Sequence, residues 1–306
     1  MVFAPVALFV YNRPDHTRQT VEALEANTLA GETPLHVFSD APQNAAASQA
    51  VGEVRGYIRT ISGFKSVTIV ERETNFGLAR SIIDGVTSLC AEHGRVIVVE
   101  DDLVTSPHFL TYMNDGLTRY EYEDRVMQIA GYMFPVSLKV DEDALFLPFT
   151  SSWGWATWER AWRHFDASGS GHRRLVEDQI LRQAFDLNGK YGYFQMLESQ
   201  LRGETDSWAI RWYLSVFLMN GLTMYPKKTL VRNCGFDGSG VNCVASRIET
   251  DVIDENFRVI SMPSDVSLSV EYEVVLRQFP NPRLNVGSML NRARHLFAAF
   301  CNEKPN

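Results

Sequence analysis

Short apolar runs alternate with longer segments of helical periodicity along the first 120 residues of the chain. A continuous apolar run is typical of a strand that is covered on both faces of a parallel sheet. The predicted strands are residues 6–11, 35–39, 67–70 and 95–99. Apolar residues that recur every three or four positions predict helices between them. These helices begin at Pro14 and cover residues 51–61 and 78–89.

A further helix is predicted up to Tyr120, with Ser106 as its N-cap and Pro107 at its first position. The alternation of strands and helices predicts an α/β fold with a mostly parallel sheet flanked by helices on both faces. In such sheets ligands bind outside the carboxyl ends of the strands. Polar residues that follow the predicted strands are therefore the first candidates for a functional site.

The second half of the chain lacks this alternation, and no linker-like stretch separates it from the first half. The elements expected there are a helix at 179–200, a helix at 206–219 and a glycine-rich loop at 235–240. We therefore expect one domain in two halves with a C-terminal extension. The boundaries expected for these parts are 1–125, 126–250 and 251–306.

Composition and charge argue against several classes of protein. The 306 residues are 45% hydrophobic and 22% charged, as in ordinary globular proteins. The net charge of −8 argues against binding along a nucleic-acid duplex, because such proteins present a basic face. The four cysteines include no C-x-x-C pair, which argues against a disulfide framework and a structural zinc site.

Nothing in the apolar pattern predicts a membrane span. The run at 6–11 is much shorter than the ~20 residues that a span needs, and it lacks the features of a signal peptide. A cytoplasmic protein is therefore expected. The basic and apolar segment at 285–300 could touch the inner face of the cell membrane, although a packed helix is the stronger interpretation.

The acidic triplet Glu100, Asp101 and Asp102 follows the most β-branched of the predicted strands. Three adjacent carboxylates at the end of a buried strand repel one another and lose solvation. Mg²⁺ or Mn²⁺ removes both costs, and such sites usually combine one or two carboxylates with substrate phosphates. The pattern favours a site for a metal and a diphosphate over the alternative, a solvated acidic turn before a helix.

Other polar residues follow the remaining strands. Arg13 could contact a phosphate with its fork of donors, or pair with Asp15 on the surface. Asp40 could accept a hydrogen bond from a uracil imide, and a turn aspartate is an equally good interpretation. The same alternatives are open for Asn75 and Arg80. Their expected convergence at one sheet edge favours binding.

Four of the six tryptophans lie close together, at Trp153, Trp155, Trp158 and Trp162. Aromatic rings stack on the C–H faces of sugars and also pack well in cores. Gly154, between the first two, indicates a close backbone approach. We expect at least one of these rings to contact a sugar or an acceptor.

Two further segments have alternative interpretations. Asp206 precedes a predicted helix, so by position it is an N-cap, with a role as general base as the alternative. The loop at 235–240 could cradle a phosphate, because glycines let backbone N–H groups point at an anion, and a tight turn is the alternative.

Four segments together resemble the bacterial GT-A glycosyltransferases that are related to the Golgi N-acetylglucosaminyltransferase initiating complex N-glycans. They are YNRPD at 11–15, VVEDDL at 98–103, SWGWATW at 152–158 and GFDGSG at 235–240. The resemblance covers about residues 4–245. It implies a Rossmann-like GT-A fold whose first half binds the nucleotide sugar and whose second half binds the acceptor.

The resemblance also implies roles for single residues. Asp102 would ligate Mn²⁺ or Mg²⁺, Asp101 would bond the ribose, and Glu100 would act near the donor sugar. Asp40 matches the aspartate that reads uracil. The other implied donor contacts are Tyr11, Asn12, Arg13, Asn75, Arg80 and, on the diphosphate, Ser239.

On the acceptor side, the segment that begins at Asp206 aligns with the family's Asp-Asp-Trp, whose carboxylates include the catalytic base. The resemblance therefore makes Asp206 the preferred base, and Trp208 joins Trp153 and Trp155 as an expected sugar or acceptor contact. Bacterial relatives often carry histidine where this chain has Asn242, a departure that could weaken metal binding.

The resulting expectation is an inverting, metal-dependent glycosyltransferase. It would move a sugar from a UDP-linked donor such as UDP-GlcNAc to a glycan hydroxyl, on a free, lipid-linked or protein-linked acceptor, in bacterial surface polysaccharide or glycoconjugate synthesis. A sugar-nucleotide-forming nucleotidyltransferase is one alternative, but the turn at 12–15 lacks the glycines it would need. A non-catalytic glycan-binding protein is the other. The intact triplet argues against it, and Asn242 slightly favours it.

Overall fold

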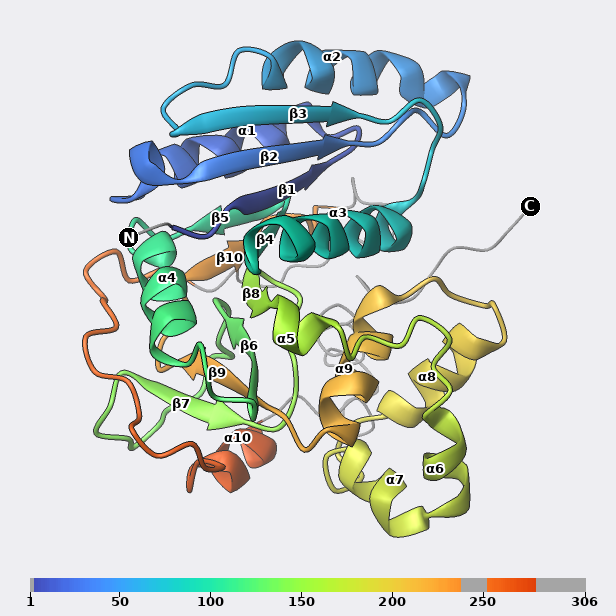
Figure 1. Ribbon diagram of the computed structural model, residues 1–306, viewed down its shortest axis with the longest axis vertical. Coiled ribbons are helices and arrows are strands. Elements are labelled where there is room, and N and C mark those ends of the chain that lie inside the picture. The colour runs from blue at the N-terminus through green and yellow to red at the C-terminus, as the bar shows by residue number, and fades with distance from the viewer. Residues whose placement is uncertain (1–2, 238–251, 279–306) are drawn as a thin grey trace.

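The computed structural model of the protein describes residues 3–237 and 252–278. Within these residues, eight strands form one mixed sheet in the order β3-β2-β1-β4-β8-β6-β9-β7 (Figure 1). They are β1 (Val6–Val10), β2 (Pro34–Ser39), β3 (Ser66–Glu71), β4 (Arg95–Glu100), β6 (Val126–Ala130), β7 (Ala144–Leu147), β8 (Trp155–Trp158) and β9 (Leu222–Pro226). β1 to β4 are mutually parallel, whereas β8 and the edge strand β7 are antiparallel to their neighbours. The expected α/β class with a mostly parallel sheet is confirmed.

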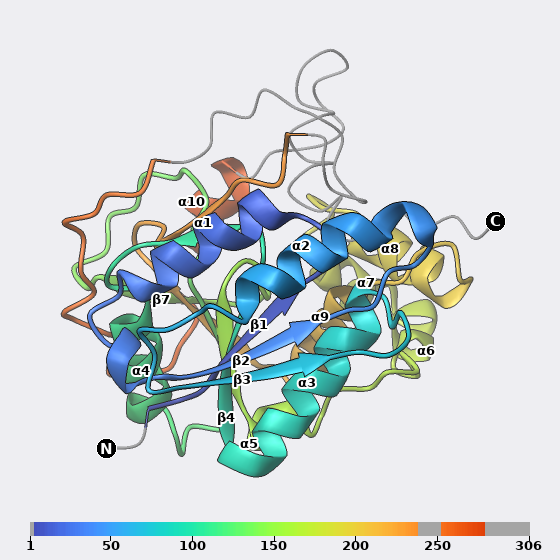
Figure 2. The same cartoon turned by 90° about the horizontal axis from the view of Figure 1, so that it is seen from above.

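Some helices cover the two faces of the sheet, and others pack on one another beside it (Figure 1). They are α1 (Pro14–Glu25), α2 (Ser48–Ile58), α3 (Leu78–His93), α4 (Phe109–Arg119), α5 (Glu159–Trp162), α6 (His172–Glu177), α7 (Gln179–Phe185), α8 (Tyr193–Leu201), α9 (Trp208–Leu218) and α10 (Tyr272–Gln278). In Figure 2, α1 and α2 lie on one face of β1 to β3, and α3 lies on the other. Val21 and Leu24 of α1 and Ile82 and Val86 of α3 are fully buried, as the apolar spacing predicts.

The prediction of a single helix at 179–200 is wrong, because the structure has two helices there, α7 and α8. Leu187, Asn188 and Gly189 lie between them with φ angles of 50°, 58° and 75°. A right-handed helix cannot continue through such residues. An apolar pattern that runs across the break does not reveal it, since both helices present apolar residues to the same core.

The predicted start of the helix that ends near Tyr120 is also wrong. α4 begins at Phe109, two residues after the expected position. The Ser106 hydroxyl accepts a hydrogen bond from the His108 amide at 3.2 Å, and the Ser106 carbonyl accepts one from the Phe109 amide at 3.0 Å. Ser106 therefore closes a tight turn ahead of the helix and does not cap it.

A second, two-stranded ribbon pairs β5 (Leu103–Thr105) with β10 (Val231–Asn233) in antiparallel register. β5 follows the acidic triplet directly, and its first residue lies opposite the last residue of β10. The ribbon thereby brings the backbone of residues 234–237 beside the triplet, across a sequence separation of 132 residues.

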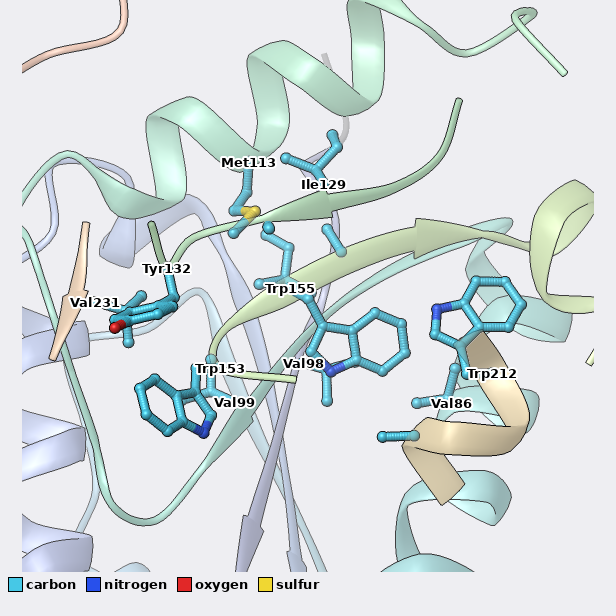
Figure 3. Packing of buried hydrophobic residues seen from close by; sticks show 14 of the residues in the cluster. Val86, Val98, Val99, Met113, Ile129, Tyr132, Trp153, Trp155, Trp212 and Val231 are labelled. Atoms are coloured by element: carbon cyan, nitrogen blue, oxygen red, sulfur yellow. The ribbon is translucent and has the colours of Figure 1, made fainter. Parts of the chain in front are cut away.

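All four clustered tryptophans are buried in the core, but at different places in it. Trp155 and Trp162 pack against Trp212 of α9. Trp153 packs against Tyr132 (Figure 3) and Phe236, whereas Trp158 donates to the Leu117 carbonyl of α4. Trp155 is fully buried in β8, where it lies opposite Val98 of β4. Its ring stacks on Trp208 with centroids 5.1 Å apart and is tilted against Trp212 at 6.4 Å. A fully buried ring offers no face to a ligand, so the expected sugar contact of Trp155 has no support here. Trp153 and Trp208 are 7% and 4% exposed, and their expected contacts stay predictions.

Residues 252–278 pack along α4 and β7. The Tyr120 hydroxyl donates to the Pro263 carbonyl at 2.6 Å, and Asp143 Oδ2 accepts from the Ser261 amide at 2.9 Å. Val275 and Leu276 of α10 are buried in the core. The two expected halves meet in one sheet through the β4–β8 pairing, and their boundaries stay predictions. Among the helices of the described segments, none is both long and apolar enough to span a membrane.

Candidate functional site

The candidate site lies at the carboxyl ends of β1 and β4, which are neighbours in the sheet. Phe9 of β1 is in register with Glu100 of β4, so the residues after both strands emerge at one edge. Arg13 begins the turn into α1, and Asp101 and Asp102 lead from β4 into β5. The structure thus brings together the basic and acidic groups that the strand-end argument placed at one edge.

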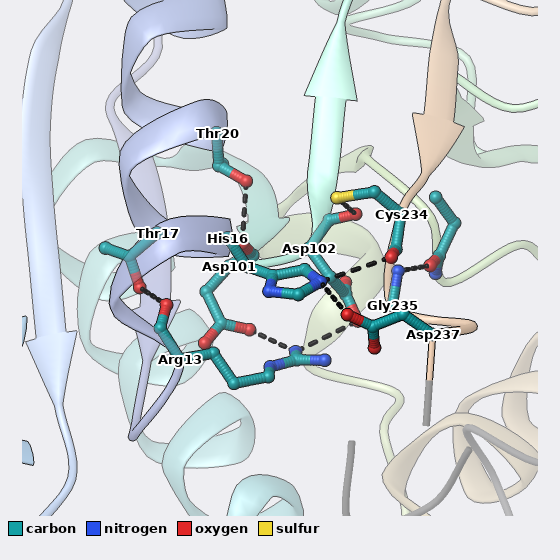
Figure 4. A network of polar contacts seen from close by, with 10 residues as sticks. Arg13, His16, Thr17, Thr20, Asp101, Asp102, Cys234, Gly235 and Asp237 are labelled. Atoms are coloured by element: carbon teal, nitrogen blue, oxygen red, sulfur yellow. Dashed lines mark hydrogen bonds and ion pairs between the residues drawn. The ribbon is translucent and has the colours of Figure 1, made fainter. Parts of the chain in front are cut away.

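Arg13 is the cation at the centre of the site (Figure 4). Its Nη2 forms ion pairs with Asp101 Oδ1 and, at 2.9 Å, with Asp102 Oδ2. The Arg13 side chain is 15% exposed, and the side chains of Asp101 and Asp102 are 6% and 10% exposed, so water has little access to the ion pairs. These partners replace the surface pairing with Asp15 that the sequence left open. The neighbouring carboxylates raise the pKa of Arg13 above its already high value, against the opposing effect of burial.

Negative charge exceeds positive charge in this cluster. Burial, followed by the charges of Asp102 and Asp101, holds the pKa of Glu100 well above its usual range. Burial also raises the pKa of Asp101, although Arg13 opposes the rise. Within residues 3–237 and 252–278, Asp101 Oδ2 is buried and has no hydrogen-bond partner. One guanidinium therefore leaves three carboxylates incompletely compensated.

This donor set fits a hard divalent cation. The described residues contain no group of three or more His, Cys, Asp or Glu side chains arranged to hold a metal ion. However, Mg²⁺-type sites commonly use one or two carboxylates and take their remaining ligands from substrate phosphates and water. The unpartnered oxygen of Asp101 and the carboxylate of Asp102 match that pattern.

The loop after β10 packs directly on the acidic residues. The Cys234 amide and thiol both donate to the Asp102 carbonyl, at 2.8 Å and 3.1 Å. A Cβ on Gly235 would overlap Asp102 Oδ2 and would lie 3.0 Å from Arg13 Nη1. A side chain at position 235 would therefore require the Asp102 carboxylate, and with it the ion pair to Arg13, to shift. Ser239 and Asn242 lie outside the described residues.

We expect Gly235→Ala to lower the free energy of unfolding by about 1–3 kcal/mol, the usual cost of overpacking. Urea denaturation measures this cost. Gly56→Ala in α2 is the matched control, because a Cβ there has no neighbour within 4 Å. The double variant Gly235→Ala/Asp102→Ala should recover much of the loss, since it removes the overlapping carboxylate. An unchanged denaturation midpoint for Gly235→Ala would contradict the close approach.

His16 is a site residue that sequence analysis missed. It follows Arg13 by three positions, so both project from the first turn of α1. His16 Nε2 lies 3.2 Å from the Cys234 carbonyl and 3.3 Å from Asp237 Oδ2. The i, i+3 spacing from Arg13 is the signal that could have identified it. Through these contacts, His16 connects α1 to residues 234–237, which pack on the acidic residues.

Asp40 has structural partners for both carboxylate oxygens. Oδ1 accepts from the amides of Ala41 and Phe76 at 2.9 Å and 2.8 Å, and Oδ2 accepts from the Gly77 amide at 2.8 Å. The Asn75 amide group donates to the Ala41 carbonyl at 2.6 Å. Asp40 and Asn75 therefore hold the turn before α3 against the end of β2. The expected reading of uracil by Asp40 stays a prediction.

Asp40→Asn should lower the free energy of unfolding by about 1–3 kcal/mol, because an amide nitrogen would face a backbone donor that is now satisfied. Denaturation in urea checks the loss. Asp265→Asn provides a control, since its exposed carboxylate accepts from the nearby Ser267 hydroxyl and should contribute little. Equal stability of Asp40→Asn and the wild type would contradict the structural role.

The remaining expected donor contacts lie around this edge. Tyr11 and Asn12 are partly buried beside Arg13, and the Tyr11 hydroxyl accepts from the Gln43 amide at 3.0 Å. Arg80 is exposed on α3, with its guanidinium 3.8 Å from the centre of the Phe76 ring. Its predicted contact with a nucleotide is untested.

Asp206 lies just before α9 and is not the N-cap of that helix. The N-cap is Ser207, whose hydroxyl accepts from the Ile210 amide at 3.3 Å. The Asp206 side chain is 48% exposed, and its Oδ1 pairs with Arg211 at 3.1 Å. Because Trp208 stacks on Trp155 of β8, the start of α9 is packed against the strand that neighbours β4.

Comparison with known proteins gives similarity only at the level of overall structure. No protein-family model matches the sequence, and no curated protein matches it. Among solved structures, TarS of S. aureus aligns with a TM-score of 0.39 and 12% identity over 76% of this chain and 36% of TarS. This chain thus spans about a third of TarS.

Two further solved structures contain Mn²⁺. The mannosyltransferase PcManGT from Pyrobaculum calidifontis, in complex with GDP-Man and Mn²⁺, aligns with a TM-score of 0.37 and 12% identity over 71% of this chain and 73% of its own. GalNAc-T7 with UDP, GalNAc and Mn²⁺ aligns with a TM-score of 0.44 and 10% identity over 74% of this chain and 43% of its own. The relation to the Golgi N-acetylglucosaminyltransferase stays a prediction.

Proposed function

We propose that this protein is a metal-dependent, inverting glycosyltransferase that uses a nucleotide-diphosphate sugar, with UDP as the preferred nucleotide. The observation that carries the proposal is the set of carboxylates at the end of β4, which Arg13 at the end of β1 compensates only in part and against which the Gly235 backbone packs. This is the sheet edge at which α/β folds bind ligands. The proposed acceptor is a glycan hydroxyl of bacterial surface polysaccharide or glycoconjugate synthesis.

Asp102, together with the Asp101 oxygen that has no partner among the described residues, is the proposed holder of Mn²⁺ or Mg²⁺. When bound, such an ion neutralises charge that develops on a departing diphosphate. Glu100 is proposed to face the donor sugar, and Arg13 to reach the diphosphate. Exclusion of water from this shielded edge would limit hydrolysis of the donor.

Asp206 is the proposed general base. It accepts the proton of the acceptor hydroxyl while the acceptor oxygen bonds to the anomeric carbon from the face opposite the diphosphate. The bond between that carbon and the diphosphate oxygen breaks, and its electron pair leaves with the diphosphate. Arg211 fixes the carboxylate, because it is itself held by the carbonyls of Ser207 at 3.0 Å and Ala167 at 3.2 Å.

A thermal-shift panel tests the donor class. We expect one class among UDP-, GDP-, dTDP- and CMP-sugars to raise Tm by about 5 °C or more at saturating concentration, and only with Mn²⁺ present. NMR of the product formed from that donor then gives the anomeric configuration. No shift with any nucleotide sugar would contradict the proposal, and retention of configuration would exclude the role of Asp206 as base in a single displacement.

A further inference from the structure

We infer that Arg13 is the built-in cation of the nucleotide-free site: it pairs with one oxygen of each of the two carboxylates proposed to hold the divalent ion, and it exchanges these partners for the diphosphate when ion and donor bind together. This inference rests on the proposed function. It adds a positioning role for Arg13 that makes binding of the metal depend on the nucleotide.

The ion pairs carry the first step. Nη2 of Arg13 contacts one oxygen of Asp101 and one of Asp102, so a single nitrogen bridges both carboxylates. The Gly235 backbone packs against the Asp102 carboxylate and the other nitrogen, Nη1, so that a Cβ there would meet both unless they moved. A divalent ion on Asp102 Oδ2 would therefore meet a guanidinium in the same shielded space. Two cations sharing one carboxylate oxygen repel each other strongly where water is excluded.

The second step is that the Arg13 side chain can leave while its backbone stays. Its carbonyl accepts from the Thr17 amide at 2.9 Å and from the Thr17 hydroxyl at 2.8 Å, which fixes the start of α1. The guanidinium is connected to that anchor by a flexible chain, so rotamer changes suffice to move it. Pro14 restricts the backbone further, because its ring locks φ at the first helical position.

The third step follows from charge. A metal ion that binds alone must leave the Arg13 guanidinium without its partners, which is costly in a shielded site. A diphosphate supplies new acceptor oxygens for the fork of donors of Arg13. Metal and nucleotide should therefore each strengthen binding of the other, and by thermodynamic linkage the factor is the same in both directions.

The test measures Mn²⁺ binding to the metal-free, full-length protein by electron paramagnetic resonance of free Mn²⁺, without and with UDP. In the wild type we expect weak binding without UDP and much tighter binding with it. For Arg13→Gln we expect at least about tenfold tighter Mn²⁺ binding without UDP, and a coupling factor between Mn²⁺ and UDP reduced by at least about tenfold. The same variant should bind UDP more weakly at saturating Mn²⁺.

Two other variants keep the result interpretable. Arg13→Lys keeps the charge but lacks the planar fork, so its Mn²⁺ affinity without UDP should fall between the wild type and Arg13→Gln. Arg160→Gln is the matched control. Arg160 is a partly buried arginine that donates to the carbonyls of Glu121, Tyr120 and Val126, away from the site. Its loss should leave Mn²⁺ affinity and coupling unchanged.

Stability in EDTA gives a second readout. Arg13→Gln should have a lower Tm than the wild type in EDTA, because Asp101 and Asp102 lose the guanidinium that pairs with both of them, and Mn²⁺ alone should restore the Tm. Arg160→Gln should not respond to Mn²⁺. Two results would contradict the proposed exchange of Arg13 from the carboxylates to the diphosphate. One is that Arg13→Gln binds Mn²⁺ no more tightly than the wild type without UDP, and the other is that the coupling factor between Mn²⁺ and UDP is unchanged. If neither protein binds Mn²⁺ even with UDP, the metal dependence of the proposed function fails as well.

Discussion

Asp102→Asn should reduce glycosyl transfer by about 10³-fold while leaving the Tm in metal-free buffer unchanged or higher. The activity falls because the substitution removes the carboxylate proposed to hold the metal. The stability does not fall because the weaker contact with Arg13 is offset by relief of the repulsion that, after burial, raises the pKa of Glu100. The amide keeps the shape of the side chain, and the backbone hydrogen bond from Cys234 to residue 102 is retained.

Opposite effects on activity and stability would mark Asp102 as a residue kept for function. Transfer is measured with the donor that the thermal-shift panel identifies, and Tm is measured in EDTA. Asp15→Asn is the control, because Asp15 is an exposed carboxylate in the first turn of α1, close in sequence to Arg13. It should change neither quantity appreciably. Full activity of Asp102→Asn with unchanged Mn²⁺ affinity would overturn the metal assignment.

Asp206→Asn should reduce turnover by about 10²–10⁴-fold, the usual contribution of a general base, with little change in donor binding. The asparagine side chain cannot accept the proton of the acceptor hydroxyl at neutral pH. Donor affinity should persist, because Asp206 precedes α9 and does not belong to the edge formed by β1 and β4. Single-turnover rates and calorimetric titration with the donor in Mn²⁺ separate the two quantities.

Glu204→Gln is the matched control for Asp206→Asn. Glu204 is an exposed carboxylate two positions earlier, and it pairs with Arg202 at 2.7 Å. Its substitution should leave turnover within about twofold of the wild type, since exposed ion pairs contribute little. A parallel loss of donor binding and turnover in Asp206→Asn would indicate a structural role for the Asp206–Arg211 pair instead.

The first half of the fold could be predicted because its signals are local. Each strand from β1 to β4 is a short apolar run, and each helix between them repeats apolar residues at helical spacing. These patterns depend only on which face of an element is buried. The convergence of Arg13 with Asp101 and Asp102 followed from the parallel order of β1 and β4, without any knowledge of their contacts.

The partners of individual side chains could not be predicted in this way. Asp40 is well placed to read a base, yet backbone amides 36 and 37 positions away use its oxygens. Trp155 looks suited to stacking on a sugar, yet β8 inserts between β4 and β6 and buries the ring completely. The spacing of His16 from Arg13 places both on one face of α1 but does not show its partners, since the β5–β10 ribbon brings the Cys234 carbonyl and the Asp237 carboxylate to it.

The sequence by itself determined the class of the fold, the edge at which chemistry can occur and the excess of negative charge there, because hydrophobic period and strand direction are properties of single segments. Only the tertiary structure decided what compensates that charge. Arg13 bridges Asp101 and Asp102. The backbone of Gly235, which is distant in sequence, packs against the Asp102 carboxylate. Such contacts depend on distances between segments that the folded sheet alone brings together.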